Sequence, residues 1–418
     1  GGDAAALSPL HALFPAAPER DSPYAPSSRR WIEPRHIALG TAARMLGLPV
    51  PEARSPSPSE RVDPAAVWEE KERSLRDMFE AVWKEARNGQ GSLPAGMQGF
   101  LTQGGEDLEA FARFHARHRR NGGSPWWTWV EEGTGSDEDG SEDEEVRFQL
   151  FLQWLAAEQR GACVRKAAER MDLGLVGDLA VGVPRDAFDV WSDPDLFALA
   201  AEIGAPPDPL GPLGQNWGLT PWDPAALLRK GLGPWARLLG HAMDGMGALR
   251  IDHAMSLQRL YWIPRGRPSR EGAYVAYPTE ELFAVLALES TRGRCAVVAE
   301  DLGTVPVGFR DRLRREGVLS TRLLYFERGE GGAFQDPGSL PREAMVTVGS
   351  HDLPPLAGWL LGRDIETRTD LGLVASEEAE AMREQRSSDR AALVEMLTEE
   401  GLLPGGAEEE GAERIPEI

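Results

Sequence analysis

Three carboxyl groups stand at the ends of apolar runs, where a parallel sheet would bring them together. Asp252 ends "ALRID" (248–252), Glu300 lies in "CAVVAED" (295–301), and Asp352 ends "AMVTVGSHD" (344–352). An ionised carboxylate can act as a nucleophile, whereas a protonated carboxylic acid can donate to a leaving oxygen. Glycoside cleavage uses two carboxyl groups in these opposite protonation states. When the carboxylate is the nucleophile, the configuration is retained.

Arg250 and His351 are the neighbours that would support two of these groups. In an extended segment Arg250 points to the same face as Asp252, since side-chain direction has a period of two. The arginine would keep Asp252 ionised, while Glu300 would be the protonated partner. Asp352, preceded by His351, suits the binding of sugar hydroxyls and the distortion of the sugar ring. Each acidic residue alone could equally be a helix cap or an ion-pair partner, so the hypothesis depends on their combination.

Regularly spaced apolar runs predict the elements that position these residues. The runs cover 175–183, 248–252, 295–301, 320–326 and 344–352, and helical or insertion-length segments separate them. Near-continuous apolar strands alternating with helices indicate an α/β fold with a parallel sheet, either doubly wound or a (β/α)₈ barrel. Acidic groups at several strand ends favour the barrel, where such ends build the active site. We expect the runs near 5–9, 175–181, 248–252, 295–300, 321–326 and 344–349 to be neighbouring parallel strands.

The remaining organisation divides the chain into four predicted regions. Residues 1–60 start the barrel with a strand and a substrate loop, 61–171 form a helical insertion, 172–375 carry the later barrel strands, and 376–418 form a helix and a tail. Within the insertion, "EEGTGSDEDGSEDEE" (131–145) cannot bury apolar surface, so we expect a disordered acidic loop. The nearby "FHARHRR" (114–120) could suggest a metal or anion site, but a solvated helix face is the preferred interpretation.

Composition limits the partners and the compartment. The 418 residues are 41% hydrophobic, enough for a large core, and the net charge of −22 argues against a nucleic acid or an acidic membrane as partner. Cys163 and Cys295 are isolated, which fits a reducing compartment and predicts a cytoplasmic protein. No glycine-rich nucleotide motif follows a strand, and we expect neither a cofactor nor a metal.

The strand-end motifs resemble a known family. "RIDH" (250–253), "AEDLGTVP" (299–306) and "SHDL" (350–353), in this order, are similar to motifs of the α-amylase superfamily and most of all to the 4-α-glucanotransferases, or amylomaltases. Further similar stretches are "SPYAPSSRRW" (22–31), "GDLAVGV" (177–183), "GAPPDPLGPLGQNWG" (204–218) and "GAYVAYP" (272–278). The resemblance runs from residue 8 to about 373, more loosely around 60–145, and does not include the acidic insertion.

The resemblance implies roles for individual residues. Asp252 would be the nucleophile, Glu300 the general acid/base and Asp352 the transition-state stabiliser, with Arg250 and His351 beside them. Further residues would line the groove that binds the glucan: Tyr24, Asp178, Gln215, Asn216 and Trp217. Independently of the family, Tyr24, Trp217 and Trp222 lie in Gly/Pro-rich stretches expected to be loops, where an aromatic ring can stack on glucose. Compared with the family pattern, the first and last barrel strands are absent, so we expect a fragment with an incomplete barrel.

The sequence therefore predicts a 4-α-glucanotransferase that transfers α-1,4-glucan segments between malto-oligosaccharides by a retaining double displacement. Two alternatives stay open at this point. One is an α-1,4-glucan hydrolase of the amylase or glucosidase type, which shares the carboxyl groups and differs in its acceptor. The other is an inactive glucan-binding fragment. Products from maltotriose separate the three, because only transfer makes longer oligomers.

Overall fold

The computed structural model describes residues 2–52, 62–87, 93–129, 141–207 and 213–403. The chain forms two compact units, Gly1–Glu300 and Asp301–Ile418. None of the helices in the described ranges is long and apolar enough to cross a membrane.

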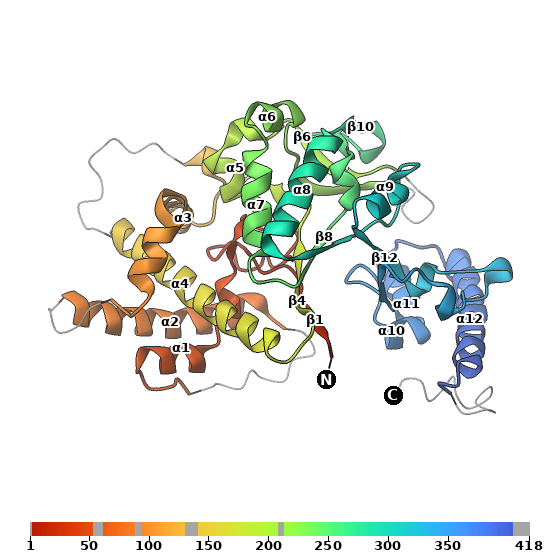
Figure 1. Ribbon diagram of the computed structural model, residues 1–418, viewed down its shortest axis with the longest axis horizontal. Helices are drawn as coiled ribbons and strands as arrows, with labels where there is room; N and C mark the ends of the chain where they lie inside the picture. The colour runs from red at the N-terminus through yellow and green to blue at the C-terminus, as the bar shows by residue number, and fades with distance from the viewer. Residues whose placement is uncertain (1, 53–61, 88–92, 130–140, 208–212, 404–418) are drawn as a thin grey trace. The chain divides into compact units, whose positions relative to one another are not determined.

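A parallel sheet forms the centre of the first unit (Figure 1). Its strands β1 (Ala4–Ala6), β4 (Gly174–Leu179), β8 (Ala248–Ile251) and β11 (Ala296–Ala299) are neighbours in this order, and each pair is parallel. The apolar runs in this unit are therefore strands, as predicted. Their buried alternation places Leu249 and Ile251 in the core, 1% and 3% exposed.

Helices cover this sheet on the face visible in Figure 1. Helix α7 (Gly233–Met243) packs on β4 and β8, and α8 (Thr279–Gly293) packs beside α7. Helix α7 buries Leu238 and Leu239 against the sheet. The sequence predicted this arrangement, in which the chain passes from a strand through a helix and back to the same sheet.

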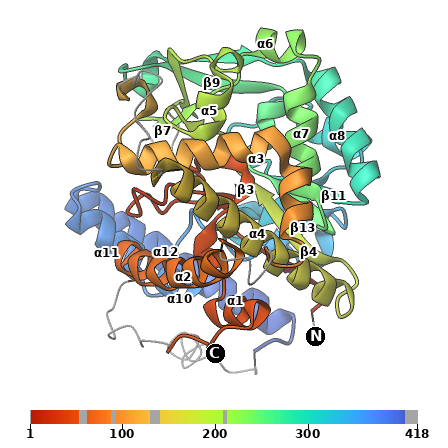
Figure 2. The ribbon, with the colours of Figure 1, turned by 90° about the vertical axis from the view of Figure 1, so that its left-hand side faces the viewer.

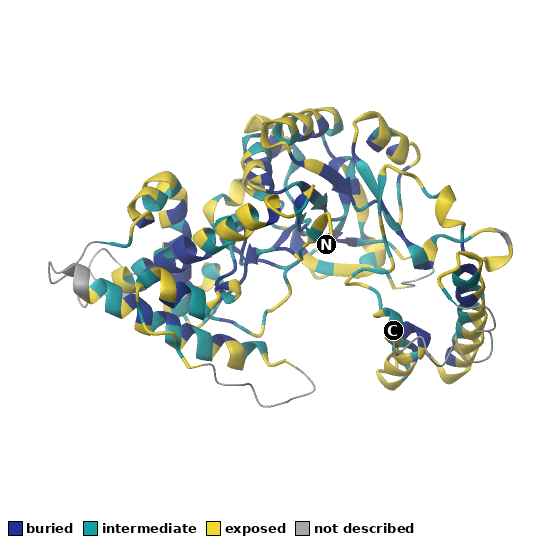
Figure 3. Ribbon diagram, turned by 60° about the horizontal axis from the view of Figure 1, so that its bottom comes forward, coloured by how far each residue is buried: buried dark blue, intermediate teal, exposed yellow. Residues whose placement is uncertain are grey.

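A cluster of helices is inserted between β1 and β4. Its helices are α1 (Leu39–Leu46), α2 (Pro64–Arg87), α3 (Met97–Arg120) and α4 (Ser141–Ala168). Figure 2 shows α3 lying across α4, and Figure 3 shows buried residues on the faces that these helices turn toward one another. Aromatic residues dominate the core between α2 and α4, where Phe79 contacts Phe148 and Phe151 at ring-centroid distances of 5.5 and 5.6 Å.

The predicted acidic loop needs a correction at its end. Residues 130–140 lie outside the described residues, but residues 141–145 form the first turns of α4 instead of a loop. Glu145 pairs with Arg76 at 2.7 Å and with Arg119 at 3.2 Å, while Glu142 pairs with Arg117 at 3.4 Å. Acidic residues also stabilise a helix N-terminus. Residues 141–145 are therefore more stable in a helix than in a solvated loop.

The histidines of "FHARHRR" do not form a solvated helix face, so that expectation is wrong. His115 and His118 are 3% and 0% exposed and pack among aromatic rings, with Phe114 stacked on His118. The exposed side of α3 is carried instead by Arg117 and Arg120. No cluster of potential metal ligands occurs in the part of the chain that the structure describes.

Two smaller sheets complete the first unit. An antiparallel sheet has the order β10 (Ala273–Ala276), β9 (Arg259–Pro264), β6 (Ala201–Ala205), β7 (Gln215–Thr220) and β5 (Val183–Pro184). The segment before the helical cluster pairs β2 (His11–Ala12) with β3 (Ser28–Ile32). The two short α-helices of the unit are α5 (Phe188–Ser192) and α6 (Pro224–Arg229).

The second unit contains the other two predicted strands as a parallel pair. Strand β12 (Leu319–Leu323) pairs with β13 (Ala344–Thr347), with Ser320 opposite Ala344. The buried carboxylate of Asp301 accepts hydrogen bonds from Thr321 N at 2.9 Å and from Arg310 at 2.8 Å. The helices of the unit are α9 (Phe309–Arg315), α10 (Leu356–Leu360), α11 (Arg363–Asp370) and α12 (Ser376–Glu399).

Gly204 provides a test of the antiparallel sheet. It lies opposite Asn216 in the β6–β7 pair, and an added Cβ would collide with the carbonyl oxygen of Gln215. Gly204→Ala should therefore separate the two strands and lower the free energy of unfolding by about 1–3 kcal/mol or more, measured in urea. Gly99→Ala is the control, because its Cβ would meet nothing within 4 Å. Equal stability of the two variants would contradict the described register.

Candidate active site

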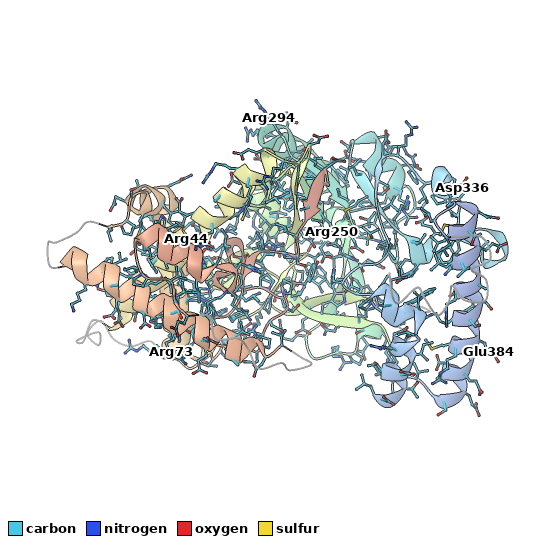
Figure 4. All side chains as sticks on the ribbon, turned by 90° about the horizontal axis from the view of Figure 1, so that it is seen from below. Arg44, Arg73, Arg250, Arg294, Asp336 and Glu384 are labelled. Carbon is cyan, nitrogen blue, oxygen red and sulfur yellow. The ribbon has the colours of Figure 1, made fainter. Side chains whose placement is uncertain are left out.

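Arg250 and Asp252 lie at the carboxyl end of β8, side by side as their spacing predicts. Arg250 Nη1 donates to Asp252 Oδ1 at 3.2 Å, and the Asp252 backbone N–H donates to the carbonyl of Leu179 at the end of β4. Figure 4 labels Arg250 among the side chains of this unit. Both residues are mostly shielded from solvent, with 12% and 17% of their side chains exposed. A fixed positive charge at this distance favours the ionised form of a carboxylate.

The same arginine reaches a second carboxylate on the neighbouring strand. Arg250 Nη1 donates to Asp178 Oδ1 at 2.7 Å, and Tyr24 donates its hydroxyl to Asp178 Oδ2 at 2.6 Å. Burial alone would lower the pKa of Arg250, but the charges of Asp178 and Asp252 raise it above its ordinary value. Burial, and then the charge of Asp178, raises the pKa of Tyr24, which keeps this hydroxyl a proton donor. The four residues form one hydrogen-bonded chain across β4 and β8.

Glu300, which follows β11, is held beside the residue after Asp252. Its backbone N–H donates to Ile251 O at 3.0 Å, and its Oε2 accepts a hydrogen bond from the backbone N–H of His253 at 2.6 Å. His253 adopts a left-handed backbone conformation with φ 42°. This turn directs the amide toward the carboxyl group of Glu300. The separation of about 5–6 Å that retention requires between the carboxyl groups of Asp252 and Glu300 stays a prediction.

His253 is a site residue that sequence reasoning quoted within "RIDH" but gave no role. Burial lowers its pKa to about 4, so the imidazole is neutral near pH 7. Its ring meets the indole of Trp217 edge to face, with a centroid distance of 5.0 Å. This contact brings β7 of the antiparallel sheet next to the end of β8. The role depends on the left-handed turn at His253. A histidine directly after a strand does not indicate such a turn, so the sequence gives no signal for it.

Trp217 belongs to strand β7 and not to a loop, which corrects the expectation from its glycine-rich surroundings. Gln215 accepts a hydrogen bond from Trp217 Nε1 at 3.0 Å, and Asn216 donates to Glu202 Oε2 at 2.7 Å. The predicted residues Gln215, Asn216 and Trp217 are therefore held in one partly exposed strand segment. Trp222 lies outside this strand segment. The guanidinium carbon of Arg29 is over its ring, 4.8 Å from the centroid.

Asp352 and His351 lie in the second unit, in the turn after β13. His351 Nε2 is 3.3 Å from Asp352 Oδ1, and the backbone N–H of Asp352 donates to Ser350 Oγ at 3.3 Å. The side chain of Asp352 is 75% exposed. Its predicted convergence with Asp252 and Glu300 stays a prediction.

A parallel sheet covered by helices, with acidic groups following several strand ends, is the arrangement expected of (β/α) barrel enzymes. Within this class, a family model described as 4-alpha-glucanotransferase matches residues 1–416. The chain belongs to the 4-alpha-glucanotransferase family.

Curated relatives and solved structures agree with this assignment. The 4-alpha-glucanotransferase of Haemophilus influenzae is 35% identical over 97% of this chain and 61% of the relative, and that of Mycobacterium bovis is 34% identical over 98% and 59%. The chain thus spans about three fifths of the length of these relatives. The amylomaltase of Corynebacterium glutamicum has a similar structure, with a TM-score of 0.81 and 29% identity over 97% of this chain and 57% of that one. An amylomaltase of Streptococcus agalactiae in complex with acarbose, 20% identical with a TM-score of 0.73 over 86% of this chain and 74% of that one, shares the fold. These neighbours confirm the predicted α/β fold of barrel type.

A buried histidine of β2, His11, makes the stability of the fold depend on pH. His11 is 6% exposed, and its Nε2 accepts a hydrogen bond from the backbone N–H of Ala180 at 3.2 Å. Burial, and then the charge of Arg29, lowers the pKa of His11 to about 3. In the unfolded chain a histidine titrates near 6.5, so the unfolded state binds the extra proton between pH 6.5 and 3.

We therefore expect His11 to destabilise the fold as the pH falls through this range, by up to about 1.4 kcal/mol per pH unit. His11→Gln keeps an acceptor for Ala180 N–H and does not titrate. The measurement is the free energy of unfolding in urea from pH 7.5 to 4.5. Above pH 7 the free energies of unfolding of the two proteins should change in parallel. Below pH 6.5 they should diverge, with that of the wild type falling more steeply. Parallel curves throughout would show that folding does not lower the pKa of His11.

Proposed function

We propose that the protein is a 4-α-glucanotransferase that moves α-1,4-glucan segments between malto-oligosaccharides by a retaining double displacement. The observation that carries this proposal is the placement of Glu300, whose carboxyl group is bound by the amide of the residue next to the Arg250-paired Asp252. Family membership supports the same reaction. Neutral malto-oligosaccharides also fit a chain with a net charge of −22.

In the first step an Asp252 carboxylate oxygen attacks the anomeric carbon of the donor glucan. The bond from that carbon to the glycosidic oxygen breaks, and Glu300 gives its proton to the departing oxygen. The products are a glycosyl ester on Asp252 and a shortened glucan. In the second step the Glu300 carboxylate takes a proton from the 4-hydroxyl of an acceptor sugar. The hydroxyl oxygen then replaces Asp252 at the anomeric carbon, with net retention.

The surrounding residues stabilise the charges and orient the two carboxyl groups. Arg250 stabilises the charge on Asp252 before attack and after departure, and Asp178 with Tyr24 fixes the position of the guanidinium. The amide of His253 orients Glu300 while leaving its second oxygen for the sugar. We assign Asp352, with His351 beside it, to the hydroxyl groups of the reacting sugar. There it would favour the distorted ring of the transition state.

Transfer requires that a sugar hydroxyl, and not water, reaches the glycosyl ester. We assign Gln215, Asn216 and Trp217 to binding of glucan next to Glu300, because Trp217 contacts His253. An indole offers an apolar face to glucose, and the polar side chains of the same strand suit its hydroxyls. We also place the protein in the cytoplasm, which the free thiols of Cys163 and Cys295 support.

Incubation with maltotriose tests the proposed reaction. A transferase yields glucose, maltose and oligomers longer than maltotriose, whereas a hydrolase yields only glucose and maltose. Binding of maltotriose without products would support a protein that binds glucan but does not cleave it. Product lengths from chromatography decide among the three.

Substitution of the two carboxyl groups tests their roles. Asp252→Asn should lower turnover by roughly 10⁴-fold or more, because an amide is a poor nucleophile. Glu300→Gln keeps an acceptor for His253 N–H and should lower the rate on maltotriose by roughly 10²–10⁴-fold, but much less on maltotriosyl fluoride, whose leaving group needs no proton. Asp195→Asn, at an exposed position, is the charge-matched control. Equal losses on both substrates would contradict Glu300 as the proton donor.

A further inference from the structure

A cavity of about 750 Å³ lies in the first unit, apart from the predicted catalytic carboxyl groups. Its walls come from β3, α3, α4 and α7, together with Gly177 and Asp178 of β4. Small-molecule sites in proteins commonly have volumes of about 300–1,000 Å³. The cavity is therefore large enough for a small ligand, and no step of the proposed reaction uses it.

The walls of this cavity carry arginines, although the chain is strongly acidic. Arg30 and Arg160 are already paired, with Asp107 at 2.7 Å and Asp244 at 3.0 Å. Arg165 of α4 and Arg237 of α7 also line the cavity. Neither of these two has an ion pair or hydrogen bond within the described ranges. Two guanidinium groups are thus available to an anion.

Glycines lie in the helices that line the cavity. Gly161 lies inside α4, where alanine would favour the helix more, and an added Cβ would meet only Arg165 Nη1, at 3.3 Å. This distance also places the guanidinium of Arg165 over the cavity wall. Helix α3 is interrupted at Gly105, with φ 53° and ψ −148°, next to Gln103 and Gly104 of the cavity wall.

The rest of the wall suits a ligand with both apolar and hydroxyl groups. Trp31 and Phe100 provide aromatic surface, and Gln103 and Ser8 provide polar groups. Trp31 is 8% exposed, and its indole N–H has no hydrogen-bond partner among the described residues. A sugar ring combines an apolar face with hydroxyl groups in this way.

We propose that this cavity binds a phosphorylated monosaccharide, with its phosphate held by Arg165 or Arg237 and its sugar toward Trp31 and Gln103. A phosphate group matches an available guanidinium group better than a neutral glucan would. Gly177 and Asp178 form part of the wall, and Asp178 holds Arg250. A ligand here therefore contacts the strand that positions Arg250. The proposal does not depend on the proposed transfer reaction.

Isothermal titration calorimetry on the purified protein tests the site without an activity assay. The probes are glucose 6-phosphate, glucose 1-phosphate, inorganic phosphate, glucose and maltotriose. We expect at least one hexose phosphate to bind, and to bind more tightly than inorganic phosphate or glucose. Absence of hexose phosphate binding would overturn the proposal, and so would equal binding of inorganic phosphate, which would show an anion site without sugar recognition.

Variants then locate the binding. The double variant Arg165→Ala/Arg237→Ala should weaken hexose phosphate binding by at least about tenfold. The control Lys166→Ala/Arg170→Ala removes the same charge from exposed positions outside the cavity wall and should change binding by less than about twofold. Equal effects of the two double variants would overturn the assignment, because they would show a general effect of charge.

A second variant places a large side chain in the cavity without changing charge. Gly161→Leu should abolish hexose phosphate binding and leave maltotriose binding at the active site unchanged. Retained hexose phosphate binding would contradict the cavity as the site. Because Arg165 and Arg237 are exposed, the arginine variant keeps the test decisive if Gly161→Leu unfolds.

Discussion

The bridge that Arg250 forms between Asp178 and Asp252 is the interaction on which the candidate site depends. One guanidinium nitrogen serves two carboxylates, at 2.7 and 3.2 Å, on neighbouring strands. Without the arginine, two like charges would face each other in a partly buried place, which is costly unless a proton neutralises one of them. The parallel register of β4 and β8 sets this geometry, because it places Asp178 directly opposite Arg250.

The other parts of the first unit maintain this register and the space in front of it. Helix α7 packs on both strands, and Glu300 joins the end of β11 to the turn after β8. Tyr24, from the segment between β2 and β3, donates its hydroxyl to the carboxylate of Asp178. Gln215, Asn216 and Trp217 of β7 are held by the pairing of this strand with β6, which needs a glycine at position 204. The site is thus assembled from segments far apart in the chain.

Sequence patterns could predict what depends on period and composition. The apolar runs gave strands because parallel strands are buried on both faces, and Arg250 and Asp252 share a face because strands have a period of two. Patterns failed where three-dimensional packing decides. "FHARHRR" looked solvated, yet His118 is fully buried among aromatic rings of other elements. The role of the His253 amide depends on a left-handed turn, which the presence of a histidine does not indicate. The acidic residues 142–145 are helical because arginines of α2 and α3 lie close enough to pair with them.

The pairing of β1 with β4 has a consequence for how the protein folds. Ala4 lies opposite Gly174, and the whole helical cluster is inserted between these two strands. Contacts between such distant residues form late, because a long loop must close before any hydrogen bond is gained, whereas helices form from local contacts. On the ribosome, the helices before residue 174 can associate before β4 is available to pair with β1. The β1–β4 pair would then form after these helices, and the edge of β1 that β4 covers would stay exposed until β4 is synthesised.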